Sequence, residues 1–242
     1  MVDARSLDHT CRQSYVSLLA RAYREGLAEE VLQNSRSNLC ELRDDRCFLR
    51  NIAYQPTGIA LGRPLPDATV TARLAEITRQ FRVYLDEMLE TPDPQAFAQV
   101  PPDWYHITLV NQSHYADGAD TVTRRAQPPA IQQQIRDLLS TVGPITVQLD
   151  RVILTAHGIF MVACYPLGAT FFELRQTIVN QIPVLATNTP RTAHMKLGHL
   201  QTMLSRAQLH ALLKVVCQIG QLDAELQFTQ VYTPSGRLSM IG

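Results

Sequence analysis

Two histidines with similar neighbours are the residues of this sequence best suited to chemistry. His106 is followed two positions later by Thr108, and His194 is followed two positions later by Lys196. Because side chains alternate along a strand, each histidine would share a face with a residue able to bind phosphate. An imidazole can act as a base when neutral and as an acid when protonated. Two histidines that face one another could therefore act as base and acid on one phosphodiester.

Both histidines lie in segments whose residue types predict strands, at 104–110 and 193–200. The apolar residues that alternate with the polar ones, such as Ile107 and Met195, should face the core. The alternative is that each histidine has a structural role, which is the usual role of a single histidine on a strand. The shared context of the two segments favours the catalytic interpretation.

The rest of the chain predicts helices and strands in alternation. Apolar residues recur at helical spacing in four segments, near 67–89, 128–139, 171–182 and 205–216, and β-prone runs occur at 57–62, 145–149, 152–155, 159–164 and 224–231. A hairpin-like junction at 156–158 favours antiparallel pairing. The expected fold class is α+β, with antiparallel sheets. Residues 1–55 also have helical periodicity and predict an N-terminal helical extension ahead of a domain at 56–242.

Composition narrows the possible functions. The 22 Lys and Arg balance the 22 Asp and Glu, and 45% of residues are apolar, which argues against disorder and against binding through a global basic field. No stretch predicts a membrane span or a signal peptide, so a cytoplasmic protein is expected. Five scattered cysteines without a C-x-x-C pair favour reduced thiols over a zinc site. We expect no metal and no cofactor.

At the two histidines the sequence resembles the 2H phosphoesterase superfamily, which contains the bacterial 2′-5′ RNA ligase-like proteins and RNA cyclic phosphodiesterases. The segment Tyr105-His106-Ile107-Thr108-Leu109 matches the first motif of that superfamily, His-x-Thr/Ser-x with apolar flanks. The segment Ala193-His194-Met195-Lys196-Leu197-Gly198 matches the second motif, but Lys196 stands where Thr or Ser is usual. The resemblance covers roughly residues 57–242, and the 88-residue separation of the histidines suits an internal duplication.

The resemblance implies a bilobal fold, with two pseudo-symmetric antiparallel-sheet lobes flanked by helices around a central cleft. It also implies a metal-independent phosphodiesterase that acts on a 2′,3′-cyclic phosphate or a 2′-5′ linkage in RNA, an oligonucleotide or a small nucleotide. His106 and His194 would be the acid–base pair, and Thr108 and Lys196 would bind the phosphate. The zero net charge favours a nucleotide or short RNA over a long polyanion, so duplex DNA and membranes are not expected partners.

Other residues are weaker candidates for substrate contact: Tyr105, Arg124, Arg125 and Tyr232. His199 has the opposite strand parity from His194 and should point away from it, unless a bulge at Gly198 resets the register. The Lys196 side chain could instead extend to solvent. Two other functions stay open at this point. One is a weakened module that binds nucleotide or RNA without turnover, and the other is a protein-interaction domain whose histidines are structural.

Overall fold

A computed structural model of the chain describes residues 59–62, 68–110, 129–154, 159–182, 193–202, 204–233 and 236–240. Four sequence predictions lie outside these residues: the N-terminal extension, the hairpin turn at 156–158, Arg124 and Arg125.

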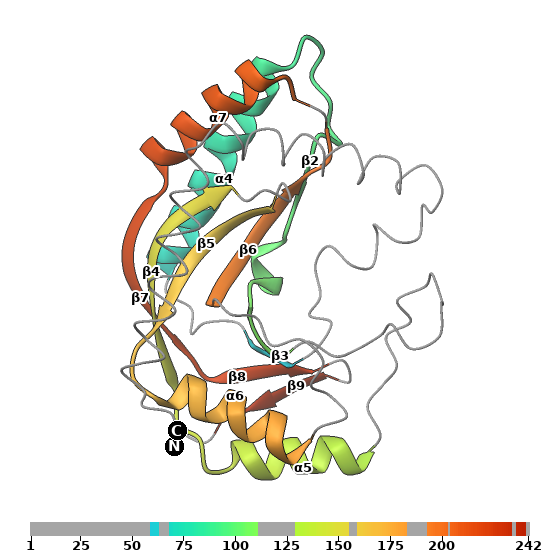
Figure 1. The fold of residues 1–242 in the computed structure, drawn as a ribbon, viewed down its shortest axis with the longest axis vertical. Helices are drawn as coiled ribbons and strands as arrows, with labels where there is room; N and C mark the ends of the chain where they lie inside the picture. Colours follow the sequence, from blue (N-terminus) through green and yellow to red (C-terminus); the bar gives the residue numbers. More distant parts are fainter. Residues whose placement is uncertain are drawn as a thin grey trace.

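The described strands form one curved antiparallel sheet (Figure 1). Along the sheet the order is β7-β4-β5-β6-β3-β1-β8-β9, and β2 pairs with β6. Every strand pair is antiparallel. The strand bounds are β1 Ile59–Leu61, β2 Phe97–Gln99, β3 Ile107–Val110, β4 Ile145–Leu154, β5 Ile159–Pro166, β6 Ala193–Leu200, β7 Gln221–Phe228, β8 Gln230–Thr233 and β9 Gly236–Ser239. Together with the helices below, this confirms the α+β fold class.

The sheet has two halves, which meet where β3 pairs with β6. Strands β7, β4, β5 and β6 form one half, and strands β3, β1, β8 and β9 form the other. Among the described residues, β3 and β6 pair between the halves only through Ile107 and Met195. Each half therefore contributes one of the two predicted histidine segments, as a bilobal arrangement requires.

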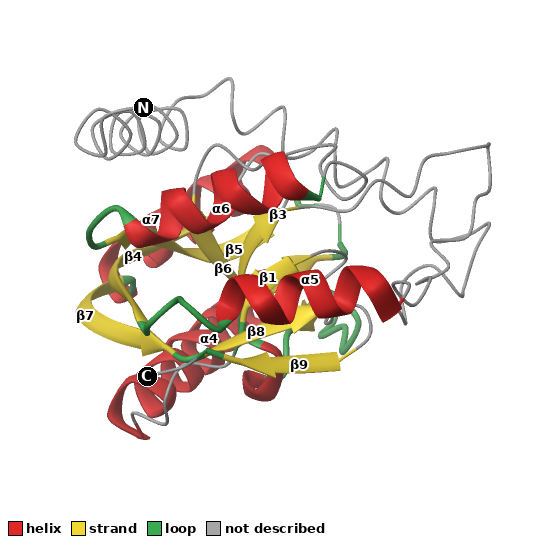
Figure 2. Cartoon of the chain, turned by 90° about the horizontal axis from the view of Figure 1, so that it is seen from below, coloured by secondary structure: helices red, strands yellow, loops and turns green. Residues whose placement is uncertain are grey.

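Two helices pack on each half. Helices α4 (Ala68–Met88) and α7 (Arg206–Ile219) lie against one another on one side of the β4 half (Figure 1). Helix α6 (Thr170–Gln181) contacts β3, and α5 (Pro129–Leu139) contacts β9, so both belong to the other half (Figure 2). Helix α7 begins after Ser205, whose side chain forms a capping box with Gln208. None of the helices in the described ranges is both long and apolar enough to cross a membrane.

The predicted closing strand at 224–231 is wrong in one respect, because it is divided between the two halves. Strand β7 pairs with β4, whereas β8, which begins at Gln230, pairs with β1. Thr229 lies between the two strands, where the chain crosses from one half to the other. The predicted break between 149 and 152 is a register irregularity within a single strand, β4.

Candidate functional site

His106, Thr108, His194 and Lys196 lie on one face of the sheet, where β3 meets β6. All four side chains are half-buried. The residues between and beside them face the main core and are fully buried: Ile107, Leu109, Met195 and Leu197. The structure thus brings together the four residues that strand parity predicts.

The register arranges these four residues as two crossed pairs. Because Ile107 is opposite Met195 in an antiparallel pair, His106 lies across from Lys196, and Thr108 lies across from His194. Directly opposite side chains have Cβ atoms about 4.5–5.5 Å apart, and diagonal neighbours are about 7–8 Å apart. His106 and His194 are diagonal neighbours. A single phosphate group could fit between their rings.

A short 3-10 turn at Pro102–Trp104 sets the orientation of the His106 ring. His106 follows this turn and directly precedes β3, so the predicted strand at 104–110 begins later than expected. The Nδ1 atom of His106 lies 2.7 Å from the carbonyl oxygen of Trp104. A carbonyl can only accept, so Nδ1 carries the hydrogen and donates it. In the neutral ring the lone pair is then on Nε2, which can act as a base.

The surroundings of His106 keep its imidazole neutral. Burial lowers its pKa from 6.5 to about 4, and the positive charges of His194 and Lys196 act in the same direction. The hydrogen bond to Trp104 opposes this shift but does not outweigh it. At neutral pH, His106 is therefore a free base with a fixed tautomer.

Lys196 is partly removed from water. It is half-buried, and burial lowers the pKa of its ammonium group. The positive charge of Lys196 lowers the pKa of His106, so the two side chains are close enough to interact electrostatically. An anion bound at this face would stabilise the charged form of Lys196.

Arg175 of α6 contacts the backbone of Thr108. Arg175 is not among the site residues predicted from the sequence. Only 7% of Arg175 is exposed. Its Nη2 donates to the carbonyl oxygen of Thr108 at 3.3 Å, and its guanidinium carbon lies 4.5 Å from the centre of the Phe171 ring. This contact ties α6 to β3 at the point where β3 separates from β6. The available sequence signal is the position of Arg175 on the apolar stripe of α6, four residues after Phe171 and three before Ile178, since arginine is rarely buried without a specific partner.

His199 lies on the same face as His194 and Lys196, contrary to the simple parity expectation. Lys196 is opposite Met161, whereas Gly198 is opposite Phe160, so Leu197 is an extra residue in β6. Leu197 and Gly198 are both buried, and the half-buried His199 follows. The sequence allows for a bulge at Gly198 that would reset the register. The structure has a bulge at this point of β6, so His199 lies on the same face as His194.

Two of the weaker candidates are corrected by the structure. Tyr105 is 2% exposed and has the same parity as Ile107, so it lies in the core, where burial raises the pKa of its hydroxyl group. Tyr232 is 1% exposed, and its hydroxyl group donates to the carbonyl oxygen of Asp103 at 3.2 Å. Its ring packs edge-on against Trp104, with the centroids 6.1 Å apart. Tyr232 therefore supports the turn before His106 and does not lie at an open rim.

Within the described residues, no group of three or more His, Cys, Asp or Glu side chains is arranged to hold a metal ion.

Comparison with known proteins gives a fold resemblance alone. No protein-family model and no curated protein matches the sequence. Among solved structures, the crystal structure of TT0787 of Thermus thermophilus is similar over 75% of this chain and 91% of that chain, with 13% sequence identity and a TM-score of 0.46.

Proposed function

We propose that this protein is a metal-independent phosphodiesterase that hydrolyses a 2′,3′-cyclic phosphate or a 2′-5′ linkage. The observation that carries the proposal is the diagonal placement of His106 and His194 on one face, each across from a residue able to bind phosphate. The proposed catalytic unit is the domain at 56–242, with residues 1–55 as an extension.

In the proposed reaction, His106 is the base and His194 is the acid. The Nε2 atom of neutral His106 accepts a proton from water as the water oxygen attacks phosphorus. The imidazolium of His194 donates a proton to the ribose oxygen as its bond to phosphorus breaks. One water molecule is added and a phosphate monoester forms, after which solvent returns both rings to their starting states. The low pKa and fixed tautomer of His106 support this assignment.

Thr108 and Lys196 would stabilise the phosphoryl group during this reaction. The Thr108 hydroxyl group can donate a hydrogen bond to a non-bridging oxygen, and Lys196 can offset negative charge that grows in the transition state. Interactions that strengthen in the transition state increase kcat, whereas equal binding of both states does not. Arg175, through the Thr108 carbonyl, would be a positioning residue for this contact.

The proposed substrate is a small nucleotide or a short RNA. The chain has no net charge, whereas a long nucleic acid is normally bound by an extended basic surface.

A second candidate function is binding of the same ligands without turnover, and Lys196 is the observation that favours it. Lysine is longer than threonine and lacks its compact hydroxyl donor. If the Lys196 stem displaces the phosphate from His194, the ligand would bind but would not react. In that case Lys196→Thr should create activity that the parent protein lacks.

The experiment is hydrolysis of a nucleoside 2′,3′-cyclic monophosphate by the purified full-length protein, with and without EDTA. We expect turnover that EDTA does not change, and a loss of about 10²–10⁴-fold in kcat/KM for His106→Ala and for His194→Ala. His210→Ala, on α7, is the matched control and should retain full activity. Tight binding without product would favour the second candidate. Activity that survives both histidine changes would contradict the proposed mechanism.

A further inference from the structure

A small apolar cluster lies beside the histidine pair and is separate from the main core. Its buried members are Ile153 of β4 and Met161 and Ala163 of β5, and Tyr165 packs against them. These β5 residues alternate with Val162 and Cys164, which belong to the main core. The cluster is therefore on the opposite face of the sheet, which is the face that carries His194.

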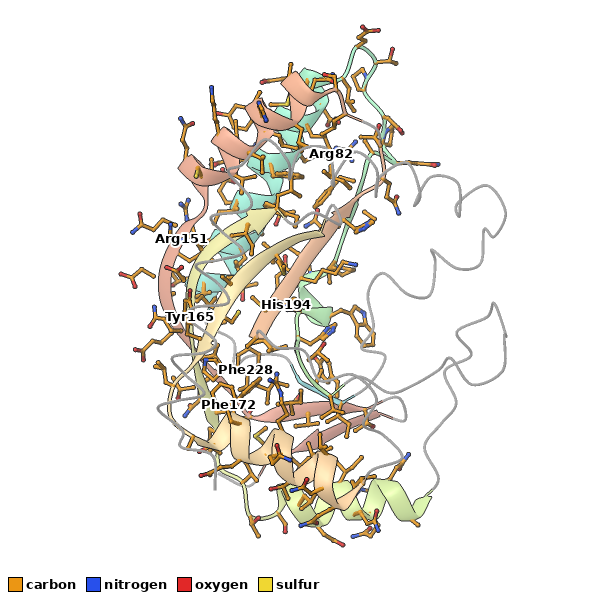
Figure 3. The ribbon with its side chains drawn as sticks, viewed as in Figure 1. Arg82, Arg151, Tyr165, Phe172, His194 and Phe228 are labelled. Carbon is orange, nitrogen blue, oxygen red and sulfur yellow. The ribbon has the colours of Figure 1, made fainter. Side chains whose placement is uncertain are left out.

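The pairing of β5 with β6 places this cluster next to the proposed phosphate site. Ala163 is directly opposite His194, and Met161 is directly opposite Lys196. Tyr165 is two residues beyond Ala163, so it is a diagonal neighbour of His194 at about 7–8 Å, a distance that aromatic side chains can span. Figure 3 shows Tyr165 and His194 on these neighbouring strands.

Tyr165 differs from the other tyrosines that the structure describes near the site. It is half-buried, whereas Tyr105 and Tyr232 are 2% and 1% exposed. A half-buried ring has one part packed against the protein and another part accessible to a ligand. Tyr84, which is 38% exposed, belongs to α4 on the other side of the sheet.

We propose that Tyr165 is the stacking surface for the nucleobase of the substrate, an inference that rests on the proposed function. A nucleotide has an anionic end and a flat aromatic end. The face has a matching division. His194 and Lys196 lie on β6 and His106 directly precedes β3, whereas the apolar cluster lies on β4 and β5, with Tyr165 packed against it. Base–aromatic stacking is strong and tolerates any base, because every base has a π-face. The proposed ligand is therefore a nucleotide or oligonucleotide of broad base specificity, with the base at the reacting phosphate on Tyr165.

The test compares two substrates that differ only in the base. One is a nucleoside 2′,3′-cyclic monophosphate, and the other is 1-O-methylribose 2,3-cyclic phosphate, which has the same reacting group and no base. For Tyr165→Ala we expect kcat/KM to fall about ten-fold or more on the nucleoside substrate and to stay unchanged on the methylribose substrate. Tyr165→Phe keeps the ring and should behave as the parent does. Tyr84→Ala is the matched control and should leave both substrates unaffected.

A binding measurement keeps this inference separate from the proposed function. By calorimetry, Tyr165→Ala should weaken the binding of a nucleoside 2′-monophosphate about ten-fold or more and leave the binding of ribose 2-phosphate unchanged, whether or not the protein turns over substrate. An equal loss on both substrates or both ligands would overturn the inference, because Tyr165 would then only support the histidines. No loss on any of them would overturn it as well. If neither the parent nor any variant hydrolyses a cyclic phosphate while the calorimetric difference holds, the proposed function fails and the base site stands.

Discussion

Ile107 of β3 pairs with Met195 of β6, and within the described chain this is the single pairing between the two strands. Each of the two residues is flanked on both sides by a residue of the candidate site. The pairing therefore converts two motifs that are 88 positions apart in the sequence into neighbours on one face. It also crosses them, since each histidine lies across from the residue two positions after the other histidine.

Removing the charge of Lys196 should raise the pKa of His106. The ammonium of Lys196 is one of the groups that lower this pKa to about 4, and Lys196→Met keeps the apolar stem while it removes the charge. The pKa can be measured by NMR titration of the His106 ring protons. Lys214→Met, on the exposed side of α7, is the control and should leave the value unchanged. An unchanged pKa in Lys196→Met would show that the Lys196 ammonium points away from the histidines.

The acid limb of the pH–rate profile should lie unusually low for a histidine. The base must be neutral, so kcat/KM is lost as the pH falls through the pKa of His106 in the free enzyme, about 4. An unperturbed histidine would lose activity near pH 6.5. In Lys196→Met this limb should move to higher pH, in step with the NMR titration. A limb near pH 6.5 in the parent protein would mean that another group is the base.

Gly198 should tolerate no side chain, because the bulge packs its Cα against Phe97. An added Cβ would lie 2.0 Å from Cζ of the Phe97 ring, which belongs to the main core. We expect Gly198→Ala to destabilise the protein by about 1–3 kcal/mol, as overpacking of a core does. At Gly143 a new Cβ meets nothing within 4 Å, so Gly143→Ala should change the free energy of unfolding by less than about 0.5 kcal/mol. Urea unfolding of both variants measures the difference, and equal stabilities would contradict the packing described at the bulge.

Strand parity and helical periodicity predict much of this structure. The alternation around His106 and His194 places the four site residues on one face, and the apolar spacing near 205–216 corresponds to α7. These features depend on residues that are close together in the sequence. Tyr105 is nevertheless predicted as a substrate contact, although it has the same parity as Ile107, and the structure places it in the core.

Features that depend on distant pairing could not be predicted in the same way. The crossing at Thr229 follows from which strands β7 and β8 join. The alternation of apolar and polar residues breaks at Thr229 and Gln230, but this break does not indicate which strand each side pairs with. The extra residue at Leu197 is revealed by the register against β5, although Gly198 is a weak local signal for a bulge. The contact from Arg175 to the Thr108 carbonyl joins segments 67 residues apart.

A crystal structure of the protein with a nucleoside 2′-monophosphate tests the central claim most directly. The claim is that His106 and His194 act on one phosphate. We predict a single phosphate group with oxygen atoms about 2.7–3.2 Å from Nε2 of His106 and from a ring nitrogen of His194, and with Thr108 and Lys196 as further partners. A phosphate that contacts only one histidine, or that binds on another face of the sheet, would contradict the account.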